Sequence, residues 1–126
     1  MIYATLFLLL AHWFCDFVIQ TNAMAGNKYN SWSSMMEHVL TYSLCLYIWL
    51  LLLVGPVVAI YLMFINGTTH LVIDTYTSRM NHALWEEKRF HGFFVSVGFD
   101  QLLHVSILLY TFYKFGGLYQ WWNALT

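Results

Sequence analysis

The stretch Asn66-Gly67-Thr68-Thr69-His70-Leu71-Val72-Ile73-Asp74 closes an otherwise apolar run that starts at Val57. A run of this length and composition is typical of a membrane-spanning helix, in which an imidazole or a carboxylate is costly. His70 and Asp74 are four residues apart, so on a helix they project from one face, one turn apart. Polar groups at that depth usually face a bundle interior and mark a functional site.

Three further apolar runs carry the same kinds of polar residue. His12 and Asp16 repeat the spacing of four, Asp100 and His104 reverse it, and His38 lies in the remaining run. Length and hydropathy predict four spans, at approximately residues 2–19, 34–54, 57–77 and 92–114. Polar loops are expected at 20–32 and 78–91, and a tight turn is expected at Gly55-Pro56.

Two smaller patterns bear on the helix ends. Ser34 and Glu37 have the spacing of a capping box at the start of the second span. Tyr119, Trp121 and Trp122 form an aromatic tail of the kind that sits among lipid headgroups.

Alternation of the spans would bring the polar residues to one level. In an up-down bundle, the end of the first span, the start of the second, the end of the third and the first half of the fourth lie on the same side of the membrane. The sequence therefore predicts an all-α, integral membrane, four-helix up-down bundle made of a single domain over residues 1–126. Seven side chains are expected to meet there: His12, Asp16, His38, His70, Asp74, Asp100 and His104.

Composition and charge agree with the membrane class. The 126 residues are 60% hydrophobic and only 9% charged, against about 25% charged in a soluble domain. The net charge of −1 gives no footprint for nucleic acid. The expected loops on the polar side hold every basic residue except Lys114: Lys28, Arg79, Lys88 and Arg89. The positive-inside rule thus predicts a multi-pass protein of the inner (plasma) membrane, with both termini outside and the polar side in the cytoplasm.

Four histidines and three aspartates exceed the four ligands of one structural zinc. They suit two divalent ions, of Zn, Mn, Fe or Mg, with positions open for water. The expected metal ligands are His12, Asp16, His70, Asp74, Asp100 and His104. His38 is expected to be a ligand or the catalytic general acid or base. The oxygens of a substrate would be bound by Gln20, Lys28 and Gln101. Cys15 and Cys45 are expected to be small buried hydrophobes and neither a disulfide nor a metal pair.

Several functions are compatible with this cluster. The favoured one is a metal-dependent hydrolase acting on a phosphate ester or a lipid-like substrate. A proton or metal-ion transporter, or a relay, could use the same side chains. A third alternative is a small phage-type membrane protein that binds a host protein. The histidines could also have a purely structural role and hydrogen-bond between neighbouring helices. The lipid bilayer is the expected partner, and a homo-oligomer is compatible with the sequence.

The motifs also carry a resemblance that covers nearly the whole chain. His12-x3-Asp16-Phe17 with Gln20-Thr21-Asn22 and Lys28, then His38, His70-x3-Asp74 and Asp100-Gln101-x2-His104, resembles the bacterial and phage membrane family catalogued as domain of unknown function 3307. The resemblance implies a small multi-span membrane protein and little about its activity. The spaced His and Asp set is also similar in style to membrane-bound metal-dependent hydrolases, by analogy.

Overall fold

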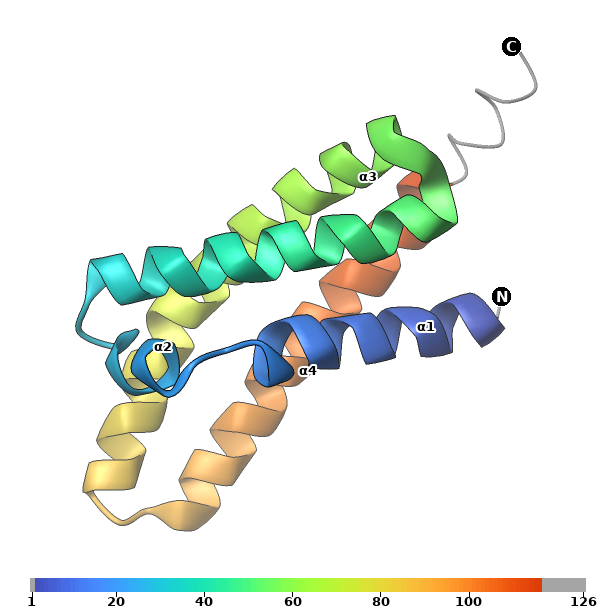
Figure 1. The fold of residues 1–126 in the computed structure, drawn as a ribbon. Helices are drawn as coiled ribbons and strands as arrows, with labels where there is room; N and C mark the ends of the chain where they lie inside the picture. The colour runs from blue at the N-terminus through green and yellow to red at the C-terminus, as the bar shows by residue number, and fades with distance from the viewer. Residues whose placement is uncertain (1, 117–126) are drawn as a thin grey trace, which may run out of the picture.

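The computed structural model describes residues 2–116, which form helices and short turns without a strand in that range (Figure 1). The elements are α1 (Ile2–Trp13), the π-helix η1 (Phe14–Val18), α2 (Asn22–Asn27), α3 (Trp32–Glu86) and α4 (Phe90–Phe115). The all-α class is therefore confirmed. The aromatic tail of Tyr119, Trp121 and Trp122 lies outside the described residues.

The long element α3 is a helical hairpin that folds back at Gly55 (Figure 1). Gly55 has φ 70° and ψ 170°, a conformation that a residue with a Cβ avoids. Pro56 follows it and has no N–H to continue the hydrogen bonding of the first arm. The N-terminal arm covers residues 32–54 and the C-terminal arm covers 56–86. The tight turn expected at Gly55-Pro56 is thus confirmed.

The long helical segments run back and forth between two ends of the molecule. Figure 1 places the N-terminus and the bend at Gly55 toward one end, and α2 and the turn between α3 and α4 toward the other. α3 contacts α1, η1, α2 and α4, and α1 also contacts α4. This alternation brings the end of α1 and the middle of α4 to the level of the polar residues on both arms of α3.

The helix ends differ from the expected ones at three places. Ser31 is the N-cap of α3, its Oγ accepting a hydrogen bond from Ser34 N at 3.3 Å. The prediction that Ser34 and Glu37 form a capping box is therefore wrong, because the helix begins before Ser34. The Glu37 side chain is exposed. The expected loop at 20–32 contains α2, whose N-cap is Thr21.

The third difference is the length of the C-terminal arm of α3, which continues to Glu86. The polar loop predicted at 78–91 is reduced to residues 87–89, and α4 begins at Phe90. Residues 78–86 are polar but contain neither Gly nor Pro, so nothing in that stretch stops the helix. Polarity alone was a poor signal for a loop there.

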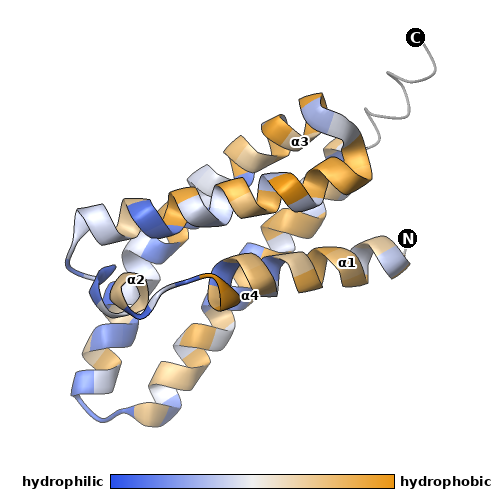
Figure 2. Ribbon diagram, in the orientation of Figure 1, coloured by the Kyte–Doolittle hydropathy of each residue, from blue (hydrophilic) through white to orange (hydrophobic). Residues whose placement is uncertain are grey.

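The interior is apolar at one end and polar at the other. Fully buried leucines pack toward the Gly55 end: Leu46, Leu50, Leu62 and Leu108. Buried His and Asp side chains occupy the half toward α2. The outward faces carry large exposed apolar side chains such as Leu52, Phe64 and Phe94, and Figure 2 shows orange ribbon along α1 and both arms of α3.

By length and composition, α3 and α4 could each cross a membrane, and Ile2–Val18 is a shorter apolar helical stretch.

Close approach of the two arms of α3 depends on Gly67. A Cβ at this position would collide with Ser43 Oγ on the N-terminal arm. The Ser43 hydroxyl is itself held by donating to Val39 O at 2.7 Å. Gly67 lies one turn before His70, so this contact brings His70 close to the facing arm.

Candidate metal centre

The π-helix η1 places Asp16 in the middle of the bundle. A π-helical turn is wider than an α-helical one and often lies at a functional site. His12 Nε2 and Asp16 Oδ2 are 3.7 Å apart across this turn. The other carboxylate oxygen, Oδ1, faces the two arms of α3. A uniform α-helix over residues 2–19, as the sequence suggested, would not show this widening.

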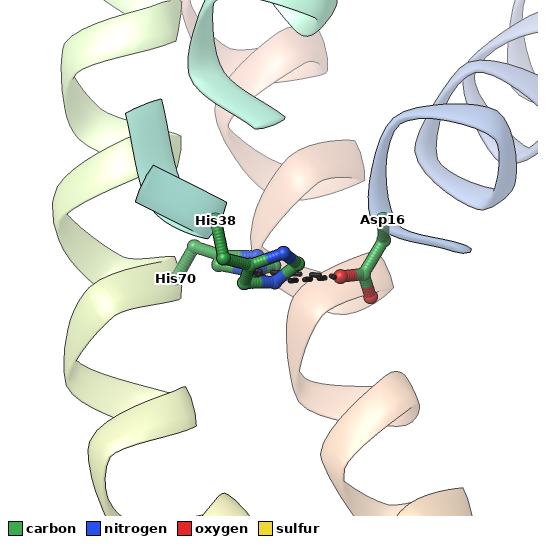
Figure 3. A group of neighbouring side chains, drawn as sticks. All are labelled: Asp16, His38 and His70. Atoms are coloured by element: carbon green, nitrogen blue, oxygen red, sulfur yellow. Dashed lines mark hydrogen bonds and ion pairs between the residues drawn. The ribbon is translucent and has the colours of Figure 1, made fainter. Parts of the chain in front are cut away.

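Asp16, His38 and His70 form the first group of converging ligand atoms (Figure 3). Asp16 Oδ1 lies 3.2 Å from His38 Nε2 and 3.6 Å from His70 Nε2. The two Nε2 atoms are 3.0 Å from each other. Figure 3 shows that the three side chains come from η1 and from the two arms of α3 and point toward one another. All three are buried.

His70, Asp74 and His104 form the second group, which shares His70 with the first. Asp74 Oδ1 is 3.0 Å from His104 Nε2, and Asp74 Oδ2 is 3.5 Å from His70 Nε2. Asp74 Oδ2 also lies 3.2 Å from His38 Nε2. In each group the ligand atoms lie within 4.8 Å of one another. Together they put three imidazoles and two carboxylates from three elements around one small volume.

Lys28 reaches this cluster from the end of α2. Its Nζ donates to Asp74 Oδ2 at 2.7 Å and lies 3.4 Å from His38 Nε2. Within residues 2–116 it is the only lysine or arginine paired with a carboxylate of the cluster. Asp16, Asp74 and Asp100 carry three formal negative charges against this single ammonium. Two buried negative charges therefore remain to be offset by protonated imidazoles or by a bound cation.

His12 and Asp100 lie behind the converging atoms. His12 Nε2 is 2.9 Å from Gln101 Oε1, and its Nδ1 is 3.3 Å from the Tyr42 hydroxyl. Asp100 Oδ1 accepts a hydrogen bond from Thr77 Oγ1 at 2.6 Å and lies 3.4 Å from His104 Nε2. Both were expected to be metal ligands. Instead they lie next to the two groups of converging atoms: His12 contacts Asp16, and Asp100 contacts His104.

The three residues expected to bind substrate occupy different places. Lys28 is inside the cluster. Gln101 connects two of the aspartates, because its Nε2 donates to Asp16 Oδ2 at 3.1 Å and to Asp100 Oδ2 at 3.0 Å. Gln20 is half-buried, and its Oε1 is buried without a hydrogen-bond partner among the described residues.

Sequence reasoning missed Tyr42 and Thr77. The fully buried Tyr42 ring stacks on the His70 ring, with centroids 4.0 Å apart and planes at 19°. Tyr42 follows His38 by four residues and Thr77 follows Asp74 by three. The helical spacing that paired the His and Asp residues could therefore have found both.

The two cysteines stay outside the groups of ligand atoms. Cys15 is buried in the core and Cys45 is half-buried against it. Both thiols are free, and their sulfur atoms lie 2.7 Å apart. Both were expected to be buried, and Cys15 is buried whereas Cys45 is only partly so.

The donor set fits a divalent transition metal. Imidazole with carboxylate suits Zn, Fe or Mn better than Ca. A cluster that holds excess negative charge and facing imidazole nitrogens has the composition of a metal site.

Comparison with known proteins gives one match. A family model described as "Protein of unknown function (DUF3307)" matches residues 4–126, which confirms the family indicated by the His and Asp motifs. No curated protein and no solved structure matches the chain.

Proposed function

We propose that this chain, which belongs to the DUF3307 family, is an integral membrane metal-dependent hydrolase acting on a phosphate ester or a lipid-like substrate. The observation that carries the proposal is the pair of buried ligand groups that share His70. Because the family description assigns no activity, the argument rests on the chemistry of these residues.

The distribution of side chains supports insertion in a bilayer. Apolar side chains cover the outward faces of every long helical segment, while His, Asp, Asn and Thr lie inside. In water this much contiguous apolar surface would promote association. In lipid the same surface is solvated, and the polar groups face one another as they must.

Four spans are compatible with the helix lengths. Each arm of α3, at 32–54 and 56–86, exceeds the ~20 residues that cross a bilayer, and α4 has 26 residues. α1 and η1 together, Ile2–Val18, are close to the lower limit of about 17 residues. We propose that the end of the bundle bearing α2 faces the cytoplasm and that both termini lie outside, because Lys28, Arg79, Lys88 and Arg89 lie at that end.

We propose that the cluster holds two divalent ions. Asp16, His70, Asp74 and His104 would hold them, and His38, the fifth member of the two groups, would be left to move a proton. Two divalent cations would offset the three negative charges of Asp16, Asp74 and Asp100. Bound there, the ions would supply Lewis acidity and a nucleophile from water at neutral pH.

The protein's own residues would do the rest. His38 is the candidate for moving a proton, because its Nε2 lies within 3.4 Å of His70, Asp16, Asp74 and Lys28. Gln101 and Tyr42 fix the position of His12. Lys28 is placed to meet a phosphate oxygen at the cytoplasmic side of the cluster.

A proton or ion relay is the second candidate, favoured by the continuous contacts from His12 through Asp16, His38 and Asp74 to His104. The polar contacts go one layer further, where Asn66 Nδ2 donates to Thr111 Oγ1 at 3.0 Å. Beyond that layer the buried side chains of the described residues are apolar, including Leu50 and Leu62, each with no exposed surface. A path to the far side would have to cross this apolar layer, which argues against transport.

The test is metal content together with activity. Protein purified in detergent is expected to contain about two divalent ions per chain and to release phosphate from a soluble phosphate monoester or from a phospholipid in mixed micelles. His38→Gln should retain metal-dependent folding but lose most of the activity. Glu37→Gln, which changes the exposed neighbour of His38, is the matched control and should behave as wild type. Protein that binds no divalent metal would overturn the proposal.

A further inference from the structure

A second feature lies beside the cluster, on the cytoplasmic side of Lys28. A cavity of about 220 Å³ opens between α2, the C-terminal arm of α3 and the first turn of α4. Six of its lining residues matter here: Lys28, Tyr29, Ser78, Asn81, Trp85 and Phe93. Its volume is below the ~300–1,000 Å³ of a pocket for a drug-sized ligand. The cavity is therefore of a size for a headgroup and not for a whole lipid.

Two polar side chains of this cavity have unmet hydrogen bonds. Ser78 is 9% exposed, and its Oγ is buried without a hydrogen-bond partner among the described residues. Asn81 Oδ1, one turn further along α3, is also buried and has no hydrogen-bond partner among the described residues. Leaving buried polar atoms unpaired is destabilising. An amide oxygen can only accept, so the missing partner of Asn81 is a donor, such as a hydroxyl group.

Lys28 joins the cavity to the cluster. It lines the cavity, and its Nζ donates to Asp74 Oδ2 at 2.7 Å. Among the described residues, no Asp or Glu lines the same cavity. An anion there would compete with Asp74 for the Lys28 ammonium, and it would lie next to the candidate ligands. A phosphate is the anion that a flexible ammonium of this kind commonly binds.

Aromatic rings form the remaining walls. The Tyr29 ring stacks on His82, with centroids 3.6 Å apart and planes at 16°. Trp85 packs edge-on against Phe93, with centroids 5.1 Å apart. Such walls suit the carbon face of a small polyol.

We propose that this cavity binds the hydroxylated headgroup of a phosphate ester, with the phosphate at Lys28 and the hydroxyl groups at Ser78 and Asn81. The inference rests on the proposed function, because it assigns the substrate class of the same site. The ligand chemistry is a polyol phosphate, supplied by a glycerol-type phospholipid or by a free polyol phosphate.

The test is a binding measurement on the full chain in detergent micelles with a chelator present, so that metal does not contribute. The probes are glycerol 3-phosphate in solution, phosphatidylglycerol and, for comparison, phosphatidylcholine, which lacks hydroxyl donors. Native mass spectrometry counts the bound molecules. We expect phosphatidylglycerol or glycerol 3-phosphate to bind more tightly than phosphatidylcholine. The probe that binds better identifies the source, lipid or free.

Three variants locate the binding. Ser78→Ala and Asn81→Leu should each weaken binding by about tenfold, the loss for one buried hydrogen bond. Ser96→Ala is the matched control, because Ser96 Oγ is also buried and unpartnered but does not line this cavity. Equal binding of the two lipids, or unchanged binding by both Ser78→Ala and Asn81→Leu, would overturn the inference. Because the assay is free of metal, its failure is distinct from a failure of the hydrolase proposal.

Discussion

Asp74→Asn is the change that tests the metal centre most directly. The Asp74 carboxylate contacts four partners: Lys28 at 2.7 Å, His104 at 3.0 Å, His38 at 3.2 Å and His70 at 3.5 Å. Asparagine keeps the shape and removes the charge. It also leaves the Lys28 ammonium without its carboxylate, while relieving repulsion among three buried aspartates. These effects oppose each other, so the stability of the metal-free protein should change little.

The response to metal should change much more. A ligand that binds only the folded state at a hundred times its Kd stabilises that state by about 2.7 kcal/mol. For a chain of this size about 1 kcal/mol corresponds to roughly 4 °C in Tm, so wild type should gain on the order of 10 °C when Zn²⁺ or Mn²⁺ is added. Asp74→Asn removes the carboxylate of the second ligand group and should lose most of that gain at the same metal concentration.

The assay is thermal unfolding in detergent, with a chelator and then with each metal. Asp100→Asn should show an intermediate response, because residues that support ligands change metal affinity by about 10–100-fold, and its gain should return at higher metal concentration. Glu37→Gln, at an exposed site, should keep the full gain. If Asp74→Asn and wild type gain equally, Asp74 holds no metal and the second ligand group does not exist as described.

Three further predictions concern packing and orientation. Gly67→Ala should destabilise the fold by about 1–3 kcal/mol, because the new Cβ would collide with Ser43. The control Gly98→Ala, whose Cβ would meet nothing within 4 Å, should be neutral or stabilising by up to ~1 kcal/mol. Equal melting temperatures of the two variants would contradict the close approach of the two arms. Tyr42→Phe should lower stability by about 1 kcal/mol, the loss of its bond to His12, and Tyr42→Leu should lower it further because stacking on His70 is also lost. A cysteine introduced by Lys88→Cys should be protected from an impermeant thiol reagent in intact cells, and labelling from outside would reverse the proposed orientation.

Local spacing in the sequence determined much of the fold and of the site. A spacing of four residues puts His70 with Asp74 on one helical face wherever the helix lies. Gly55-Pro56 breaks a helix because one residue adopts positive φ and the next has no N–H. Alternation of the helical segments then brings the polar residues to one level. These properties depend on neighbours in the chain, which is why they could be predicted.

Tertiary structure alone decided how the seven polar residues divide. Both arms of α3, η1 and α4 meet around His70, whose shared position comes from the close contact at Gly67. His12 and Asp100 have the same sequence spacing as the candidate ligands. In the structure His12 contacts Gln101 and Tyr42, Asp100 contacts Thr77, and both lie outside the two groups of converging atoms. Lys28 reaches Asp74 across 46 residues of sequence. Such relations depend on distances between segments far apart in the chain, and these are set by side-chain packing that local periodicity does not encode.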